Sequence, residues 1–381
     1  METLLIKGCS LPELEAWVES IGERRFRARQ IFKHVYGRRI AKWDECTDLG
    51  RMFRVQLDFG TRLNALSFQE KQESSDGTVK YRFGLQDGHS IETVLIPDPP
   101  RYTLCVSSQV GCALGCAFCL TATMGLKRNL NTAEIVDQVC QVQRDTEQRN
   151  HISNIVFMGM GEPLANYDAV LKAIGILTDP NGLAFSHRRI TLSTAGLVPQ
   201  MIKLGDQSPV NLAVSLHASS DAVRDSIMPV NRTYPLPVLM EACRRYPLAP
   251  RKRITFEYIL IDRVNDSTED ARALVKLLDG IRAKVNLIPL NPRPQCALRR
   301  PSQERMLAFQ EVLQKAHLTA MIRQSRGADI SAACGQLAVP HDDSPSADAP
   351  AKGKTSRKTA CMENCLSVPV DGQKRFGQKD D

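Results

Sequence analysis

The sequence predicts an α/β protein whose core is a partial (β/α)6-type barrel, with a small helical N-terminal accessory domain and a β-hairpin extension. Strand-sized apolar runs recur from about residue 100 onward, and helical patterns lie between several of them. In the residues before 100, by contrast, helical patterns come first and strand patterns follow. A complete eight-fold barrel takes roughly 250 residues, and this region holds about six units. The 381 residues therefore divide into an accessory unit (1–95), a core (98–337) and a tail (338–381).

The accessory unit begins with helical patterns and ends with two strands. Apolar residues recur at helical spacing in three segments, 11–22, 26–40 and 49–60. Two alternating segments then flank the turn signal Asp87-Gly88, which predicts a hairpin.

In the core, strands and helices alternate until the apolar pattern ends near Leu337. Strands are expected at 102–108, 152–158, 188–194, 210–217, 253–261, 284–290 and 319–325. Helices are expected at 132–144, 169–177, 236–246, 270–278 and 303–316. The tail is rich in Ser, Ala, Pro and Lys, a composition typical of disorder. Cys361 and Cys365 there form an isolated C-x3-C pair without further ligands.

Composition narrows the class of protein. The net charge is +8, both ends are charge-balanced, and the surplus lies within 99–341. Such a basic middle favours contact with a polyanion, although a solvated surface explains it equally well. No apolar run has the length of a membrane span or signal peptide, so we expect a cytoplasmic protein that does not associate with a membrane. Its 12 cysteines are then thiols, metal ligands or redox groups rather than a disulfide framework.

The sharpest motif is a C-x3-C-x2-C triplet directly after the first strand of the alternating region, formed by Cys112, Cys116 and Cys119. A [4Fe–4S] cluster normally takes four cysteines, so three leave one iron open for another ligand. Zinc is the alternative, but a structural zinc site needs four ligands and no fourth follows at that spacing. The triplet resembles that of the radical S-adenosylmethionine (SAM) superfamily, in which the open iron binds SAM.

Unusual residues also stand at the ends of later predicted strands, where barrels place their ligand sites. Each alone has an ordinary explanation as a turn, a helix cap or a core residue. Together they favour a SAM pocket formed by Gly161, Glu162, Ser193, Ser215, Leu216, His217 and Asn291.

Longer strings make the resemblance more specific. They are CVSSQVGC at 105–112, FMGMGEPL at 157–164, LST at 192–194, VSLH at 214–217 and AACGQL at 332–337. These resemble the RlmN/Cfr family of RNA methyltransferases from about residue 10 to Leu337. Pro163 favours the RlmN branch, which methylates adenine C2, because the Cfr branch, which methylates C8, has Ala there.

The resemblance implies roles for three more residues. Cys334 would carry a methyl group as S-methylcysteine, Cys105 would resolve the RNA adduct through a transient disulfide with Cys334, and Glu92 would be the general base. Taken singly, a strand cysteine is usually a small buried apolar residue and a hairpin glutamate usually faces solvent.

The resemblance also implies the cofactors and partners. We expect one [4Fe–4S] cluster and SAM, with 23S rRNA and tRNA as substrates, and flavodoxin or ferredoxin as electron donor to a monomer. Basic residues between 188 and 300 fit contact with the RNA backbone. Two other functions remain open: a C8 methyltransferase, and a non-catalytic metal-binding protein that binds RNA.

Overall fold

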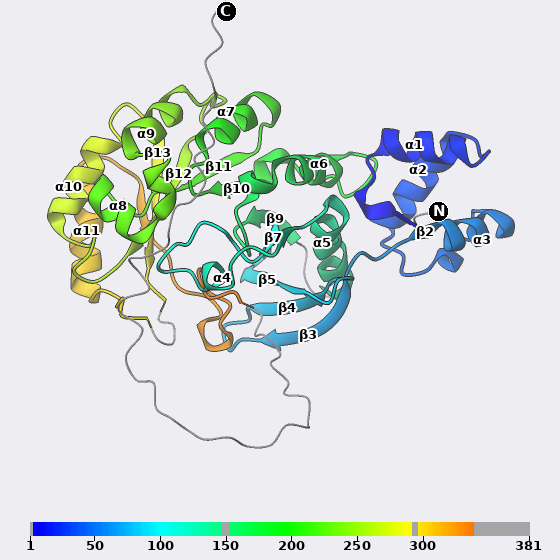
Figure 1. Cartoon of the computed structure of the whole chain (residues 1–381), viewed down its shortest axis with the longest axis horizontal. Helices are drawn as coiled ribbons and strands as arrows, with labels where there is room; N and C mark the ends of the chain where they lie inside the picture. The colour runs from blue at the N-terminus through cyan, green and yellow to red at the C-terminus, as the bar shows by residue number, and fades with distance from the viewer. Residues whose placement is uncertain (1–2, 147–151, 292–295, 339–381) are drawn as a thin grey trace, which may run out of the picture. The chain divides into compact units, whose positions relative to one another are not determined.

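The structure is a computed structural model that describes residues 3–146, 152–291 and 296–338 (Figure 1). Its centre is a ten-stranded sheet with the order β14-β13-β12-β11-β10-β9-β6-β5-β4-β3. Seven of its strands, β6 and β9 to β14, run parallel to one another. Their bounds are β6 (Arg101–Cys105), β9 (Ile152–Phe157), β10 (Ile190–Thr194), β11 (Asn211–Ser215), β12 (Ile254–Leu260), β13 (Ala283–Pro289) and β14 (Ala320–Ile322).

A helical connection follows each parallel strand from β6 to β13, which confirms the predicted (β/α)6-type fold. Strands β14 and β3 are the two edges of the sheet, so the barrel is open. The connecting helices are α4 (Leu120–Thr123), α5 (Thr132–Thr146), α6 (Tyr167–Thr178), α7 (Val198–Gln207), α8 (Asp221–Ile227), α9 (Leu236–Arg245), α10 (Thr268–Leu277) and α11 (Gln303–Lys315). Helices α4, α7 and α8 were not predicted. Helix α4 has only four residues, α7 has a proline in its first turn, and α8 is short and mostly polar.

The N-terminal helices are α1 (Leu11–Ser20), α2 (Phe26–Phe32) and α3 (Arg51–Gly60). A capping box starts α1, in which the Glu13 carboxylate accepts the backbone N–H of Ser10 at 2.8 Å. Buried Lys7 forms a 2.5 Å ion pair with buried Asp137 of α5. Because an unpaired charge is costly to bury, this pair ties the N-terminal segment to the core.

Three antiparallel strands extend the sheet beyond β6: β3 (Ser67–Glu73), β4 (Val79–Gly84) and β5 (Ser90–Asp98). The hairpin β4–β5 was predicted, whereas β3 was missed because this polar edge strand lacks apolar alternation. All three are hydrogen-bonded into the core sheet, although we placed them in the unit 1–95. That division stays a prediction, and 339–381 of the predicted tail lie outside the described residues.

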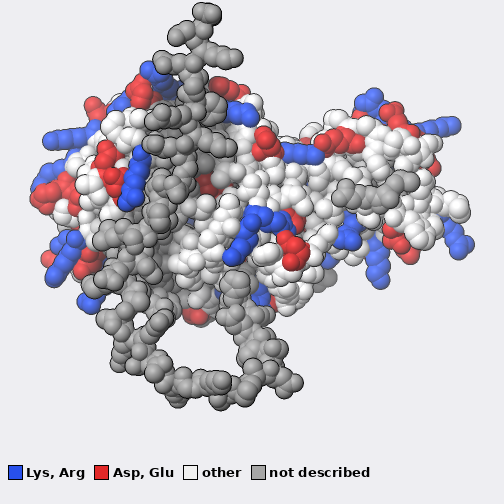
Figure 2. All heavy atoms as spheres, in the orientation of Figure 1, with Lys and Arg blue, Asp and Glu red and all other residues white. Residues whose placement is uncertain are grey.

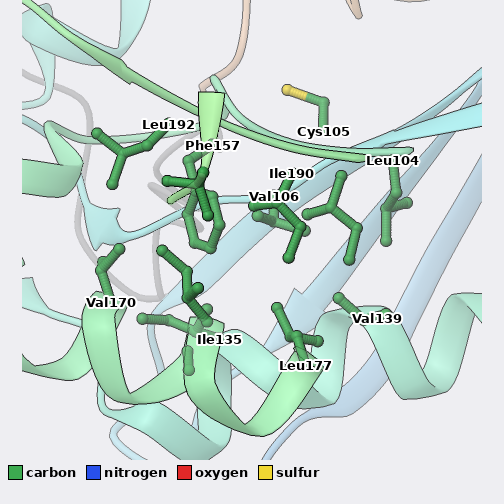
Figure 3. Packing of buried hydrophobic residues seen from close by; sticks show 14 of the residues in the cluster. Leu104, Cys105, Val106, Ile135, Val139, Phe157, Val170, Leu177, Ile190 and Leu192 are labelled. Carbon is green, nitrogen blue, oxygen red and sulfur yellow. The ribbon is translucent and has the colours of Figure 1, made fainter. Parts of the chain in front are cut away.

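The two faces of the sheet have different roles at β6. Figure 3 shows Leu104 and Val106 directed toward the helices, whereas Cys105 between them points to the opposite face. This follows from the two-residue period of a strand. The apolar core therefore lies between sheet and helices, and Cys105 faces the other way. Among the described residues, no helix combines the length and the apolar character needed to cross a membrane.

Candidate active site

The loop with Cys112, Cys116 and Cys119 is closed at its base by two short antiparallel strands, β7 (Gln109–Val110) and β8 (Arg128–Asn129). Gly111 takes a positive φ of 75°, and a Cβ there would lie 1.8 Å from the carbonyl oxygen of Gly125. Only glycine fits this crossing of two backbones. The β7–β8 pair and this backbone crossing therefore fix the base of the loop that carries the three thiols.

The three thiols lie close enough to affect one another. Burial raises the pKa of Cys112 to about 11 and raises that of Cys116 further, and the charges of neighbouring cysteines add to both shifts. Within the described part of the chain, no group of three or more His, Cys, Asp or Glu side chains is placed to hold a single metal ion. In an iron–sulfur cube each thiolate binds a different iron, so its ligands need not meet at one point. Three neighbouring thiols on a shaped loop fit such a cluster.

Gly161 and Glu162 follow β9 and lie against the base of the same loop. Gly161 has a φ of 98°, and a Cβ there would approach the Cβ of Gln109 to 2.5 Å. Glu162 is buried, and its carboxylate accepts the backbone N–H groups of Leu164 at 3.0 Å and Ala195 at 2.8 Å. Burial raises the pKa of Glu162 to about 7. Glu162 thus joins the ends of β9 and β10.

His217 stands just after β11 and contacts the cysteine loop directly. Its ring packs edge-to-face on Phe118, which lies between Cys116 and Cys119, with ring centroids 4.8 Å apart. Its Nδ1 accepts the backbone N–H of Ile259 at 3.0 Å. Burial, and then the charge of Arg224, lower the pKa of His217 to about 3, so the ring is neutral.

The other predicted SAM residues lie at or just beyond the same strand ends. Ser193 is in β10, Ser215 is the last residue of β11, and buried Leu216 follows it. Asn291 lies beyond β13, where its amide donates to the carbonyl oxygen of Cys334 at 3.1 Å and accepts from the Ser325 hydroxyl at 2.5 Å.

No motif in the sequence pointed to Arg224, which organises these strand ends. It is fully buried in α8, and its guanidinium donates to the carbonyl oxygens of Ala195, Ser215 and Leu216 at 2.7–3.0 Å. An arginine inside an amphipathic helix normally faces solvent. Only the fold shows that it holds β10 and β11 in place beside His217.

The segment that carries Cys334 lies against the cysteine loop. The backbone N–H of Leu120 donates to the carbonyl oxygen of Gly335 at 2.7 Å, and the Thr121 hydroxyl donates to that of Leu337 at 2.6 Å. Cys334 as a residue is exposed. The surrounding protein atoms nevertheless desolvate its thiol, which raises the pKa of that thiol to about 11.

Cys105 ends β6 and points to the face of the sheet away from the helices (Figure 3). Burial raises the pKa of Cys105 well above its usual value, and the charge of Cys334 contributes to the shift. The two thiols therefore lie within electrostatic reach of each other, although they are far apart in sequence.

Glu92 in β5 is buried, contrary to the ordinary expectation for a hairpin glutamate. Its Oε2 accepts the backbone N–H of Ala338 at 3.0 Å, and Lys80 lies 3.2 Å from its Oε1. Burial raises the pKa of Glu92, against the opposing effect of Lys80. In the antiparallel register Val94 pairs with Cys105, so Glu92, two residues from Val94, shares the face of Cys105.

A shaped three-cysteine loop beside the carboxyl ends of a (β/α)6 barrel defines a radical SAM enzyme. The family model of the radical SAM superfamily matches residues 106–275, and that of the ribosomal RNA large subunit methyltransferase N-terminal domain matches 5–61. A crystal structure of a radical SAM methyltransferase from Sphaerobacter thermophilus superposes with a TM-score of 0.85 at 46% identity, covering 88% of this chain and 99% of that one.

Sequence relatives narrow the class further. The dual-specificity RNA methyltransferase RlmN of Syntrophobacter fumaroxidans is 68% identical, over 88% of this chain and 98% of the relative. RlmN of Geobacter sulfurreducens is 55% identical, over 88% and 93%. The chain belongs to the RlmN family of dual-specificity RNA methyltransferases. Its cofactors are accordingly a [4Fe–4S] cluster and SAM, as expected from the cysteine triplet.

Proposed function

We propose that this enzyme methylates C2 of one adenosine in 23S rRNA, at the peptidyl transferase centre, and of an adenosine next to the anticodon in some tRNAs. The observation that carries the proposal is the contact between two loops. Leu120, next to Cys119, donates its backbone N–H to Gly335, next to Cys334. A group carried on the Cys334 sulfur is thereby held beside the proposed cluster ligands.

We assign the cluster to Cys112, Cys116 and Cys119, and SAM to Gly161, Glu162, Ser193, Ser215, Leu216, His217 and Asn291. With both cofactors bound, reductive cleavage of SAM supplies a 5′-deoxyadenosyl radical. Hydrogen bonds to backbone N–H groups hold the side chains of Glu162 and His217 in place before any ligand binds.

Adenine C2 lies between two ring nitrogens and is too electron-poor to attack a methyl cation donor, so the chain carries the methyl group itself. Cys334 takes a methyl group from one SAM. Loss of a hydrogen atom leaves a methylene radical on its sulfur, and this radical adds to C2 to form an RNA–protein link. The adduct then loses the C2 proton to Glu92 and one electron, which the [4Fe–4S] cluster, oxidised by the cleavage of SAM, would accept, and the aromatic ring is restored.

Cys105 completes the reaction. Its thiolate attacks the sulfur of Cys334, the S–CH2 bond breaks, and the electron pair stays on the methylene carbon, which takes a proton to become the methyl group. The two sulfurs form a disulfide that a cytosolic reductant must reduce before the next turnover. The raised pKa of Cys105 means that a proton must leave this thiol first.

Basic side chains occur at both ends of the strands. Arg188, Arg189, Lys252, Arg253 and Arg282 precede β10, β12 and β13, at the end opposite Cys105 and the Cys334 segment, whereas Arg299 and Arg300 follow β13. Figure 2 shows Lys and Arg interspersed with Asp and Glu on the face in view rather than gathered together. We propose that a folded RNA contacts both groups, with the target base extruded toward Cys334.

Several further points belong to the same proposal. The enzyme works as a cytoplasmic monomer, and flavodoxin or ferredoxin supplies its electrons. C2 is favoured over C8 by Pro163, which begins the turn after Glu162.

The test is mass analysis of nucleosides from RNA treated with the reduced, anaerobically purified enzyme and SAM. We expect 2-methyladenosine with wild type and none with Cys334→Ala. Recovery of 8-methyladenosine would assign the chain to C8 chemistry instead. A colourless protein that holds zinc and leaves RNA unmodified would support the non-catalytic alternative.

A further inference from the structure

Lys80 lies between two parts of the proposed catalytic machinery. It is in β4 and mostly buried, with 11% of its side chain exposed. Its Nζ lies 3.2 Å from Oε1 of Glu92 and donates to the carbonyl oxygen of Ile330 at 2.7 Å. A buried ammonium needs such partners, because the loss of water is otherwise unfavourable. Nothing in the sequence around Lys80 indicated this position.

The second oxygen of Glu92 reaches the other end of the same segment. Its Oε2 accepts the backbone N–H of Ala338 at 3.0 Å. Ile330 precedes Cys334 by four residues and Ala338 follows it by four. The Lys80–Glu92 pair therefore contacts the Cys334 segment on both sides of the thiol, once through each partner.

Neighbouring contacts show that the hairpin holds this segment at several points. The Asp76 carboxylate accepts the backbone N–H of Gly327 at 2.9 Å, and Asp329 accepts the Ser74 hydroxyl at 2.6 Å. These contacts hold residues 327–329, farther from Cys334. Among the described hairpin side chains that hydrogen-bond to the segment, Lys80 alone also contacts Glu92.

Arg82 provides a natural comparison. It lies directly opposite Glu92 in the β4–β5 register, yet it pairs with Glu70 at 2.8 Å. Lys80 and Arg82 both lower the pKa of Glu92 against the effect of burial, and Lys80 has the larger effect. The two cations have similar charge and neighbouring positions, but only Lys80 bridges to the Cys334 segment.

We propose that Lys80 is a positioning residue that holds the Glu92 carboxylate in register with the segment carrying Cys334. The inference rests on the proposed roles of Glu92 and Cys334. By fixing both groups, Lys80 sets where the proton acceptor stands relative to the carbon attached to the Cys334 sulfur. Its charge also favours the ionised form of Glu92, which is the form able to accept a proton.

The first measurement is an infrared titration of the holoenzyme, in which the carboxyl band that disappears in Glu92→Gln reports Glu92 directly. Lys80→Met removes the favourable charge, so we expect the pKa of Glu92 to rise by about one unit or more. Arg82→Met should raise the pKa of Glu92 by less than about half as much. Lys80→Arg, which keeps the positive charge, should leave the pKa of Glu92 close to its wild-type value. An equal shift for Lys80→Met and Arg82→Met, or no shift, would overturn the proposal.

The second measurement follows the segment itself. In Lys80→Met the contact with Ile330 is lost, so we expect iodoacetamide to alkylate Cys334 several-fold faster than in wild type at the same pH. Arg82→Met should leave this rate unchanged, and iron content and circular dichroism establish that each variant is folded. Unchanged alkylation in a folded Lys80→Met protein would contradict the bridging role.

Failure of the proposed function would be visible separately. If Glu92→Gln releases methylated RNA at the wild-type rate, Glu92 is not the base. The infrared shift and the alkylation rate still decide whether Lys80 couples Glu92 to the Cys334 segment. If Glu92 is the base, the acid limb of the release rate in Lys80→Met should move to higher pH together with the measured pKa.

Discussion

The carbonyl oxygen of Gly335 accepts the backbone N–H of Leu120 at 2.7 Å, which joins the residue after Cys334 to the residue after Cys119. Gly335 has a φ of 79°, and a Cβ there would lie 3.2 Å from the carbonyl oxygen of Phe118. This close backbone approach brings together two segments far apart in the chain. It fixes the separation of the main chain at Cys119 from the main chain at Cys334.

The two-thiol mechanism predicts opposite results for the two cysteines. Cys105→Ala should accumulate a covalent RNA–protein adduct, because no thiol can break the S–CH2 bond, whereas Cys334→Ala should form none. A denaturing gel with labelled RNA measures both. Cys140→Ala, at a buried position in α5, is the control and should release product normally. Full turnover by Cys105→Ala would show that this thiol is not required.

Gly111→Ala should prevent the cysteine loop from holding its cluster. A Cβ would lie 1.8 Å from the carbonyl oxygen of Gly125, at a φ of 75°, so the loop must shift. We expect iron content and the visible absorption of the purified protein to fall severalfold or more. Gly175→Ala is the matched control, because a Cβ at that position in α6 meets nothing within 4 Å. Normal iron loading in Gly111→Ala would contradict the assigned loop.

Glu162 should make stability depend on pH. Its pKa rises from 4.5 in the unfolded chain to about 7 in the fold, so the folded state binds more protons between these values. Stability therefore falls as pH rises from 4.5 to 7, by up to about 3 kcal/mol, and levels off above. The thermal unfolding midpoint of the wild type, measured relative to that of Glu162→Gln, should fall as the pH rises over this interval.

The control for this titration is Glu311→Gln, which replaces an exposed glutamate paired with Lys315. The pKa of Glu311 is lowered, so it is ionised in both states above pH 5. The difference between Glu311→Gln and wild type should be constant from pH 5 to 8. A constant difference for Glu162→Gln over the same range would mean that Glu162 is ionised throughout.

The basic residues before β10 should contribute to RNA affinity without affecting chemistry. Arg188→Gln with Arg189→Gln should weaken binding and lower the slope of log affinity against log salt by roughly one to two. The single-turnover rate at saturating RNA should stay unchanged, because these residues lie at the strand ends opposite Cys334. Arg272→Gln, which removes an exposed arginine paired with Glu269, should leave the slope unaltered. An unchanged slope in the double variant would place the RNA elsewhere.

Much of the fold could be predicted because the signals are local. Strands β9 to β14 and helices α5, α6, α9, α10 and α11 lie within a few residues of their expected bounds, since periodicity is a property of neighbouring residues. Strand β3 was missed because an exposed edge strand needs no apolar face. Helix α8 was missed because it is short and mostly polar, and one of its two buried residues is an arginine, Arg224, whose partners are distant carbonyl groups.

The same distinction applies to the site. The sequence predicted Cys112, Cys116 and Cys119 as cluster ligands from their spacing, because this motif is contiguous in the chain. The roles predicted for Cys105, Cys334 and Glu92 came from the family resemblance of short strings of residues. That Glu92 is buried, that it meets Ala338, and that Lys80 joins it to Ile330 could not be predicted. Burial and pairing of charges depend on which distant segments the sheet brings together. The sequence alone therefore determined which residues we assign to the chemistry. Only the tertiary structure decided how they are held, because desolvation and hydrogen bonding act between residues that the chain itself keeps far apart.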